Sequence, residues 1–365
     1  MRLAITGLSN SGKTTVFNAL TGQHHKTTIY PTIGGGPVIG VVKVHDPRVE
    51  RLSEIFKPRK TTFATVEYID YIGLTKGDIS QNRKVFDLIK DADAIVHVVR
   101  AFQDDSVPHP LGEVGPSRDI ETVELELVFG DLEFVEKRLE RIEEASKKGK
   151  KPNEAEKRLL LRCREYLEKE IPLRDVSFNE EEQQVMKPLQ FISTKPELVV
   201  LNIGEDLLKS ERASDIQEEA ERYFREKSGP GKTLVTTLCG KIEMEIAQLP
   251  AGEAKAFLDD LGIEEPALNR LIHLSYDLLG LISFLTVVED EVRAWTVTRG
   301  TDALRASGKI HSDMERGFIK AEVVNYESFI PAGSLSAARE RGLLRLEGKT
   351  YEVRDGDIIH FRFNI

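Results

Sequence analysis

Residues 7–14, which read Gly-Leu-Ser-Asn-Ser-Gly-Lys-Thr, constrain the fold of this chain more than any other segment. They match the pattern Gly-x-x-x-x-Gly-Lys-Ser/Thr and lie between a short apolar run and a helix-like stretch. In such a loop, backbone N–H groups surround phosphate oxygens, Lys13 brings a positive charge to the β- and γ-phosphates, and the Thr14 hydroxyl can ligate Mg²⁺. The motif therefore predicts a nucleotide site built on an α/β sheet.

The strands expected around this loop alternate with helical or loop stretches, as is typical of a doubly wound α/β sheet. The alternation stops after Val99 and resumes only at Leu198, as if a segment had been inserted between two strands of one sheet. The predicted strands span residues 2–6, 38–44, 64–70, 94–99, 198–202 and 233–239.

The inserted segment has apolar residues at helical spacing on both sides of a lysine-rich turn, residues 147–153. This spacing predicts an antiparallel helical hairpin, or coiled coil. The four lysines of the turn are either solvated or able to contact phosphate. The apolar residues on the first helix are Leu132, Val135, Leu139 and Ile142, and those on the second are Leu160, Cys163 and Leu167.

The last part of the chain is rich in strands, with apolar runs at residues 291–297, 318–326 and 349–363 and a turn at Asp355 and Gly356. It predicts a small α+β domain. The expected order is a nucleotide-binding domain in two parts, 1–130 and 191–280, the helical insertion, 131–190, and the C-terminal domain, 281–365.

The composition is that of a protein with several cores: 365 residues, 40% of them hydrophobic. The longest nearly apolar run, 278–288, is shorter than the roughly 20 residues that a membrane helix needs, and residues 1–7 lack a signal peptide's apolar stretch. We expect a cytoplasmic protein with no membrane contact, preferably a monomer, with Cys163 and Cys239 as reduced thiols. A net charge of -10 means that any RNA contact must be regional.

A second motif is Asp-x-x-Gly at Asp70 and Gly73, where the third predicted strand ends. An Asp at this place can hold magnesium through water, and the Gly73 amide can sense the γ-phosphate. The next residue is Leu74, where common GTPases have a water-orienting Gln. Because an apolar side chain cannot orient water, hydrolysis must be slow, be completed by another group, or depend on a partner.

One candidate for that other group is His109, in the Pro- and Gly-rich segment 104–116. Its imidazole could swing in to orient water, although a loop histidine is more often merely exposed. The mechanism also calls for a Thr that closes over the γ-phosphate and the metal. Thr32 is the best placed of three candidates, the others being Thr27 and Thr28.

The expected base-reading loop follows the strand 198–202, with Asn202, Ile203, Gly204 and Glu205 where a guanine reader has Asn-Lys-x-Asp. The Asp of that motif accepts hydrogen bonds from the ring N–H and the 2-amino group of guanine, which adenine lacks. Glu205 is one methylene longer, and Ile203 replaces the Lys that would flank the base. These changes indicate relaxed or ATP-favouring selectivity.

With these motifs in order, the chain strongly resembles the YchF/Obg-like ATPase family, over nearly its full length. The resemblance also rests on residues 45–60, 191–206 and 261–272 and on the C-terminal run. It implies a nucleotide-binding domain interrupted by a helical hairpin, a β-grasp TGS domain at the C-terminus, ATP hydrolysis with Mg²⁺, and association with ribosomes.

Carried over residue by residue, the family's phosphate-binding motif falls on residues 10–15, its magnesium Ser/Thr on Thr14 and its catalytic histidine on His109. Its altered base motif, Asn-x-x-Glu, falls on Asn202 and Glu205. The phosphate-binding residues are then Asn10, Ser11, Gly12, Lys13, Thr14 and Thr15.

The chain departs from the family in two places. Residues 75–89 replace a longer Gly-rich stretch, and an ungapped alignment puts Gly34, not Thr32, at the threonine of the first switch. Three hypotheses follow: a slow ATPase switch on ribosomes, which leads; a ribosome- or RNA-binding adaptor that binds nucleotide but hardly hydrolyses it; and a GTPase.

Overall fold

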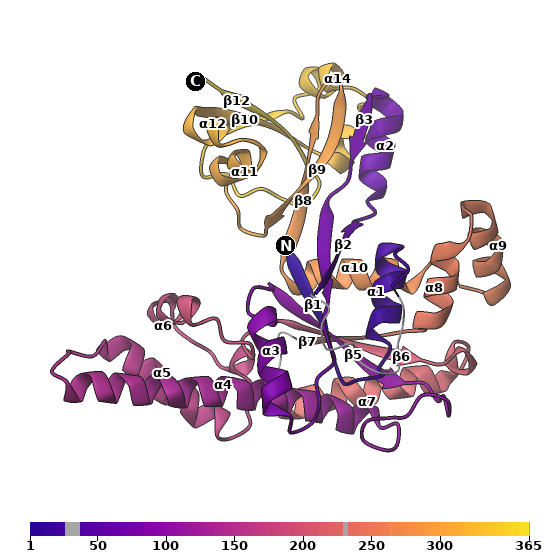
Figure 1. Cartoon of the computed structure of the whole chain (residues 1–365). Helices are drawn as coiled ribbons and strands as arrows, with labels where there is room; N and C mark the ends of the chain where they lie inside the picture. Colours follow the sequence, from indigo (N-terminus) through magenta and orange to yellow (C-terminus); the bar gives the residue numbers. More distant parts are fainter. Residues whose placement is uncertain (26–36, 229–232, 264, 365) are drawn as a thin grey trace. The chain divides into compact units, whose positions relative to one another are not determined.

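The structure is a computed structural model that describes residues 1–25, 37–228, 233–263 and 265–364 (Figure 1). The chain divides into two compact units: residues 1–41 with 67–274, and residues 42–66 with 275–365. In the described part of the chain, each unit contains one six-stranded sheet. The several cores expected from the composition are therefore present.

The sheet of the first unit has the strand order β2-β4-β1-β5-β6-β7, and its registered pairs from β4 to β7 are all parallel. Every residue of β5 and β6 is buried, as in strands covered on both faces. The predicted doubly wound sheet is confirmed. Its strands are β1 (Arg2–Thr6), β2 (Val38–Lys43), β4 (Thr65–Asp70), β5 (Ala94–Ala101), β6 (Glu197–Ile203) and β7 (Thr233–Leu238).

Helices cover this sheet on both faces (Figure 1). Residues Ala4, Ile95 and Val99 face α3 (Ile79–Ile89), α4 (Pro116–Lys147) and α7 (Glu211–Ser228) through continuous apolar cores. On the opposite face lies α1 (Lys13–Thr21), which packs against α8 (Gly240–Gln248). The chain continues through α9 (Ala251–Leu261) and α10 (Ala267–Leu278). In such a sheet, ligands bind at the carboxyl ends of the strands.

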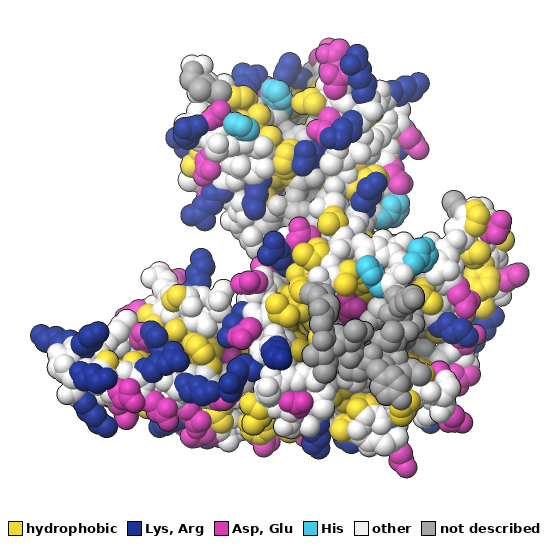
Figure 2. All heavy atoms as spheres, in the orientation of Figure 1, with side chains coloured by type: hydrophobic (Ala, Val, Ile, Leu, Met, Phe, Trp, Pro, Cys, Tyr) yellow, Lys and Arg dark blue, Asp and Glu magenta, His cyan; other side chains and the backbone are white. Residues whose placement is uncertain are grey.

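The inserted segment is the predicted helical hairpin. Helices α4 and α5 (Glu154–Leu167) share a core in which Val135, Leu139, Leu160, Cys163 and Leu167 are buried. The lysines at the turn, Lys147, Lys148, Lys150 and Lys151, are all exposed, and Figure 2 shows basic side chains gathered over this end of the hairpin. The hairpin is followed by η1 (Leu173–Asp175), α6 (Glu180–Met186) and η2 (Lys187–Leu189).

Helix α4 begins at Pro116 rather than near residue 131, where the hairpin was expected to start. Its first turns carry Ile120, Val123 and Leu127, which are buried against the sheet and not against α5. The apolar spacing that predicts the hairpin therefore begins only where α4 extends beyond the sheet. One continuous helix of 32 residues joins the nucleotide-binding sheet to the hairpin.

The second unit contains a mixed sheet of order β11-β10-β12-β8-β9-β3, with helices packed on it. Its mixture of parallel and antiparallel pairs agrees with the expected α+β domain; its assignment as TGS stays a prediction. The strands are β3 (Lys60–Thr62), β8 (Leu281–Val287), β9 (Glu291–Thr298), β10 (Phe318–Asn325), β11 (Arg345–Glu347) and β12 (Asp357–Phe363). The helices are α2 (Pro47–Phe56), α11 (Ala303–Ile310), α12 (Ser312–Arg316), α13 (Tyr326–Phe329) and α14 (Leu335–Glu340).

Residues 42–66 pack with this C-terminal unit, whereas the sequence places them in the first nucleotide-binding part, 1–130. Strand β3 pairs with β9. The Arg48 guanidinium lies 2.7 Å from the Asp355 carboxylate, and the rings of Phe56 and Phe329 stack at 5.6 Å. These contacts join residues some three hundred positions apart, and local sequence patterns carry no sign of them. No helix in the described ranges is long and apolar enough to cross a membrane.

Candidate functional site

The phosphate loop connects β1 to α1 and turns where glycine is required. Gly7 has φ 138°, and a Cβ there would lie 2.3 Å from the Val98 carbonyl oxygen. Gly12, with φ 91°, is the N-cap of α1. Because the first N–H groups of a helix have no partner within it, they are available to an anion. The predicted strand, loop and helix are thus present in the order that phosphate binding needs.

Lys13 is folded back onto its own loop. Its Nζ donates to the Leu8 carbonyl oxygen at 2.7 Å, and the residue is only 7% exposed. Burial lowers the pKa of Lys13 to about 8, against the opposing attraction of the Asp70 carboxylate. A phosphate would be a stronger partner for this ammonium than the carbonyl is.

Gly73 lies directly against the phosphate loop. A Cβ at this position would lie 2.7 Å from Lys13 Nζ and 2.9 Å from the Ser9 backbone nitrogen. Any other residue would push the loop aside. The structure therefore brings together Lys13 and Gly73, two of the three residues predicted to act in catalysis.

Asp70 and Thr14 form the candidate magnesium site. Thr14 Oγ1 donates to Asp70 Oδ2 at 2.8 Å, while Asp70 Oδ1 is buried and no described residue donates to it. Burial raises the pKa of Asp70, opposed by the Lys13 charge and the Thr14 hydrogen bond. A hydroxyl and a buried carboxylate oxygen without a partner suit Mg²⁺, which prefers oxygen ligands. Thr32, the predicted second metal ligand, lies outside the described residues.

Leu74 is part of the core. It is fully buried among Leu8, Val85 and Ile89, and its backbone nitrogen donates to the Gly7 carbonyl oxygen at 2.9 Å. The side chain therefore points away from any attacking water. Sequence reasoning missed Gln81 on α3, whose amide donates to the Gly73 carbonyl oxygen at 3.0 Å and steadies this segment.

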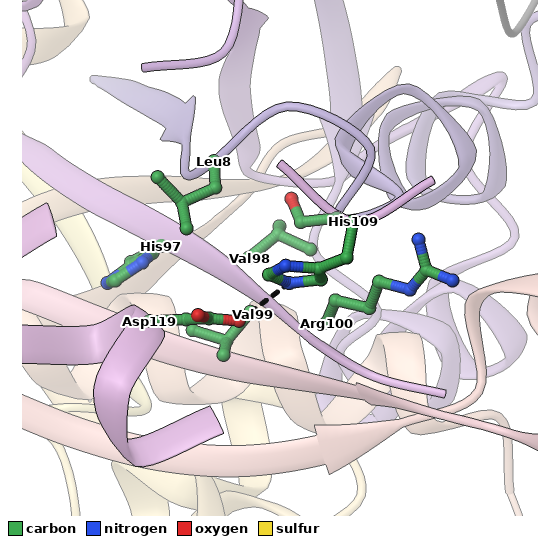
Figure 3. Close-up of a pocket in the computed structure, with 8 residues that line it drawn as sticks. Leu8, His97, Val98, Val99, Arg100, His109 and Asp119 are labelled. Atoms are coloured by element: carbon green, nitrogen blue, oxygen red, sulfur yellow. Dashed lines mark hydrogen bonds and ion pairs between the residues drawn. The ribbon is translucent and has the colours of Figure 1, made fainter. Parts of the chain in front are cut away.

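His109 is held inside the unit and not extended from its loop. Its Nε2 lies 2.9 Å from Asp119 Oδ2, and its Nδ1 accepts from the Leu111 N–H at 3.1 Å (Figure 3). Both the His109 and Asp119 side chains are only 3% exposed. The surrounding residues, among them Leu8, Val98 and Val99, leave no cavity large enough for a water molecule. In this structure the imidazole is therefore enclosed, with Leu8 and Ser11 of the phosphate loop among the residues around it.

The loop that carries His109 is fastened from two sides. From β5, Arg100 donates to the carbonyl oxygens of Phe102, Asp104 and Val107 at 2.9 to 3.2 Å. From the phosphate loop, Asn10 Nδ2 donates to the Pro108 carbonyl oxygen at 3.0 Å. Asn10, one of the predicted phosphate-binding residues, thus also contacts the histidine loop.

Asn202 joins three segments at the expected base site. Its Nδ2 donates to the Ser11 carbonyl oxygen at 3.0 Å, and its Oδ1 accepts from the Gly240 N–H at 2.9 Å. The Ile203 side chain lies in the apolar core shared with α7, on the other face of β6. The prediction that Ile203 contacts the base is therefore not supported by its placement.

Glu205 is paired with a residue that the sequence did not suggest. Its Oε1 lies 2.5 Å from Lys241 Nζ, in the segment that follows β7, and both side chains are largely exposed. A second missed residue is Phe102: a Cβ at Gly12 would lie 3.8 Å from its ring, and a Cβ at Gly204 would lie 3.7 Å from its Cβ. An aromatic ring thus lies between the phosphate loop and the base loop. The sequence signal that could have identified Phe102 is an aromatic residue directly after a predicted strand.

Family models match both ends of this chain. The family model YchF-GTPase_C, described as a protein of unknown function, matches residues 281–364. The model MMR_HSR1, described as a 50S ribosome-binding GTPase, matches residues 2–129.

Two relatives, each named Ribosome-binding ATPase YchF, are similar along the whole chain. The protein of Bacillus subtilis (strain 168) is 43% identical over 364 residues, which is 99% of this chain and 98% of that protein. The protein of Haemophilus influenzae is 40% identical over 368 residues, 100% and 99% of the two chains. Among solved structures, the Schizosaccharomyces pombe YchF GTPase matches with a TM-score of 0.82 at 27% identity and covers 99% of this chain and 97% of its own.

Proposed function

The chain belongs to the YchF family, and we propose that it is an ATPase that binds Mg²⁺-ATP in the phosphate loop, hydrolyses it slowly and couples this cycle to ribosome binding. The observation that carries the proposal is the joint packing of Lys13, Asp70 and Gly73 around one loop at the carboxyl edge of the sheet. Relatives of the same length named as ribosome-binding ATPases support it.

In this proposal the chain's own residues do mainly electrostatic work. The N–H groups of residues 10–15 hold the β- and γ-phosphates, and Lys13 leaves the Leu8 carbonyl to neutralise their charge. Gly73 packs against the loop, and its amide would donate to the γ-phosphate. Thr14 and Asp70 would hold Mg²⁺, the first directly and the second through water. Mg²⁺ neutralises charge on the phosphate oxygens when bound; Thr32 stays the second candidate ligand on sequence grounds.

His109 is the proposed group that orients the attacking water. Leu74 cannot do so because it is apolar and buried in the core. A neutral imidazole can accept a proton or a hydrogen bond from water. His109 must first leave Asp119, since both of its ring nitrogens are engaged in this structure.

The base site supports a preference for ATP over GTP. An Asp that reads guanine must accept from two N–H groups, whereas the Glu205 carboxylate is already paired with the Lys241 ammonium. Together these side chains offer one acceptor and one donor, which satisfy the 6-amino group and the N1 atom of adenine but leave the 2-amino group of guanine without an acceptor. Phe102 offers an apolar surface near the same place.

The proposed partner is the ribosome, and the exposed lysines of the hairpin turn, at residues 147–151, are the proposed contact with ribosomal RNA phosphate. A cytoplasmic location and a monomer are part of this proposal. A GTPase is the second candidate, since the S. pombe protein and both matching family models carry that word in their names or descriptions.

The proposal is tested by measuring phosphate release from ATP and from GTP by the full chain, alone and with ribosomes. Slow release from ATP that Lys13→Ala abolishes is expected. Release that stays at the blank level even with ribosomes would favour the adaptor hypothesis, and faster release from GTP would favour the GTPase.

A further inference from the structure

We propose that Asp119 is a positioning residue that holds His109 away from the nucleotide in the resting protein and thereby limits turnover. The proposal rests on the function proposed above for His109. It concerns what keeps that imidazole inside the unit, and which part of the fold controls its release.

The geometry leaves His109 no free nitrogen. The Leu111 N–H donates to Nδ1, so Nδ1 carries no proton, and Nε2–H donates to Asp119 Oδ2 at 2.9 Å. The neutral ring can orient water only after one of these bonds has broken. Because both side chains are 97% buried, water does not replace the Asp119 oxygen while the ring stays in place.

Asp119 is itself firmly placed. Its Oδ1 accepts from Arg118 Nε at 3.1 Å and from Arg118 Nη2 at 2.8 Å, and its backbone nitrogen donates to the Gly115 carbonyl oxygen at 2.9 Å. It lies in the first turn of α4, where the helix dipole favours a negative charge. These contacts couple the position of the carboxylate to the start of α4.

Helix α4 links the contact between Asp119 and His109 to other parts of the unit. Five residues beyond Asp119, Glu124 forms a buried ion pair with Arg174 of η1, which also pairs with Glu197 of β6. The same helix then forms the first arm of the hairpin. A partner that shifts α4 against the sheet would withdraw Asp119 from His109, and Asn10 links the phosphate loop to the same histidine loop through Pro108.

The test uses Asp119→Ala, which removes the acceptor, and Asp119→Asn, which keeps the shape and removes the charge. The matched control is Glu121→Gln, on the same helix, which pairs with Lys227 of α7 rather than with His109. Thermal melting confirms that each full-length variant is folded. The kcat for ATP, its KM and the affinity for a fluorescent ATP analogue are then measured for each, with His109→Ala and the double variant beside them.

Asp119→Ala is expected to raise kcat by about tenfold to a hundredfold, the effect of losing one charge-assisted hydrogen bond, with nucleotide affinity unchanged. Asp119→Asn is expected to lie between the wild type and Asp119→Ala, and the double variant to show no gain over His109→Ala. Cleavage of residues 104–116 by a dilute protease is expected to become faster in Asp119→Ala and to stay unchanged in Glu121→Gln.

A kcat in Asp119→Ala that is unchanged, or that falls to the level of His109→Ala, would overturn the proposal; the fall would mean that Asp119 supports the active imidazole. If His109→Ala alone left turnover unchanged, the proposed role of His109 would fail, and the inference on Asp119 with it. Lowered turnover in His109→Ala with no gain in Asp119→Ala rejects the inference on Asp119 alone.

Discussion

Glu205 and Lys241 face each other across the base loop, with Oε1 and Nζ 2.5 Å apart. The first residue occupies the place of the guanine-reading Asp, and the second follows β7. Since the pair is exposed in this structure, its own contribution to stability is small. The pair would contribute to base selectivity once a bound base covers it and excludes water, because the polar groups of the base then need a donor and an acceptor from the protein.

Lys241→Met is expected to reduce the preference for ATP over GTP by about threefold to tenfold, since the donor to adenine N1 is lost and Glu205 becomes free to accept from guanine. The preference is measured from the concentrations of ATP and of GTP that displace a fluorescent ATP analogue. Lys209→Met removes an exposed lysine four residues beyond Glu205 and should leave the ratio unchanged. An unchanged ratio in Lys241→Met would mean that the pair does not read the base.

Asp70→Asn is expected to lower ATP turnover by about a hundredfold and to raise the Mg²⁺ concentration needed for half-maximal rate, because the carboxylate charge is lost while a hydrogen-bond acceptor for Thr14 remains. Magnesium titrations of phosphate release measure both effects. Asp87→Asn, an exposed site on α3, is the control. Equal Mg²⁺ dependence in wild type and Asp70→Asn would place the metal elsewhere.

The lowered pKa of Lys13 predicts a pH dependence of ATP binding. In the free protein the amine loses its proton as the pH rises through about 8, whereas bound phosphate favours the ammonium. Above this pH, binding should take up a proton, and ATP affinity should fall by up to about tenfold per pH unit. Calorimetry at pH 9 in two buffers of different ionisation enthalpy detects the uptake. Lys13→Arg, which stays charged, should show none; equal heats for the wild type in both buffers would contradict the prediction.

Leu74→Gln restores the residue type of common GTPases, yet it should produce no gain in turnover, because the side chain at this position lies in the core. A buried amide without partners should instead lower the free energy of unfolding by about 1–3 kcal/mol. Urea unfolding measures this, and Leu88→Gln, at a site 42% exposed, should change it by less than about 0.5 kcal/mol. Faster hydrolysis in Leu74→Gln would show that the side chain reaches the nucleotide.

Replacing the four turn lysines, Lys147, Lys148, Lys150 and Lys151, with alanine should weaken ribosome binding without changing ATP affinity. If all four meet phosphate, the slope of log K against log salt should flatten by roughly 3. Co-sedimentation at several salt concentrations measures the slope. Lys169→Ala, which removes an exposed lysine beyond the end of α5, is the control, and an unchanged slope in the four-alanine variant would exclude the turn as the RNA contact.

The parts of the site that come from one continuous stretch could be predicted from the sequence. The phosphate loop is a local pattern between a strand and a helix, and Asp70 with Gly73 marks a strand end. Asn202 follows a strand that is buried along its length. The alternation of apolar runs was likewise enough for the parallel sheet, and the helical spacing of apolar residues was enough for the hairpin.

The rest depends on contacts between distant residues, which local spacing does not record. Asp119 meets His109 only because α4 starts beneath the loop that carries it, and Lys241 meets Glu205 only because β7 lies beside β6. The pairing of β3 with β9 moved residues 42–66 into the second unit. Ile203 was misjudged because successive residues of a strand face opposite sides.

We propose that this nucleotide site binds ATP in preference to GTP. Competition of unlabelled ATP and GTP against a fluorescent ATP analogue on the full chain with Mg²⁺ tests it most directly. ATP is expected to displace the analogue at a lower concentration than GTP does, and Lys13→Ala is expected to bind no analogue at the same concentrations. Displacement by GTP at the lower concentration would contradict it.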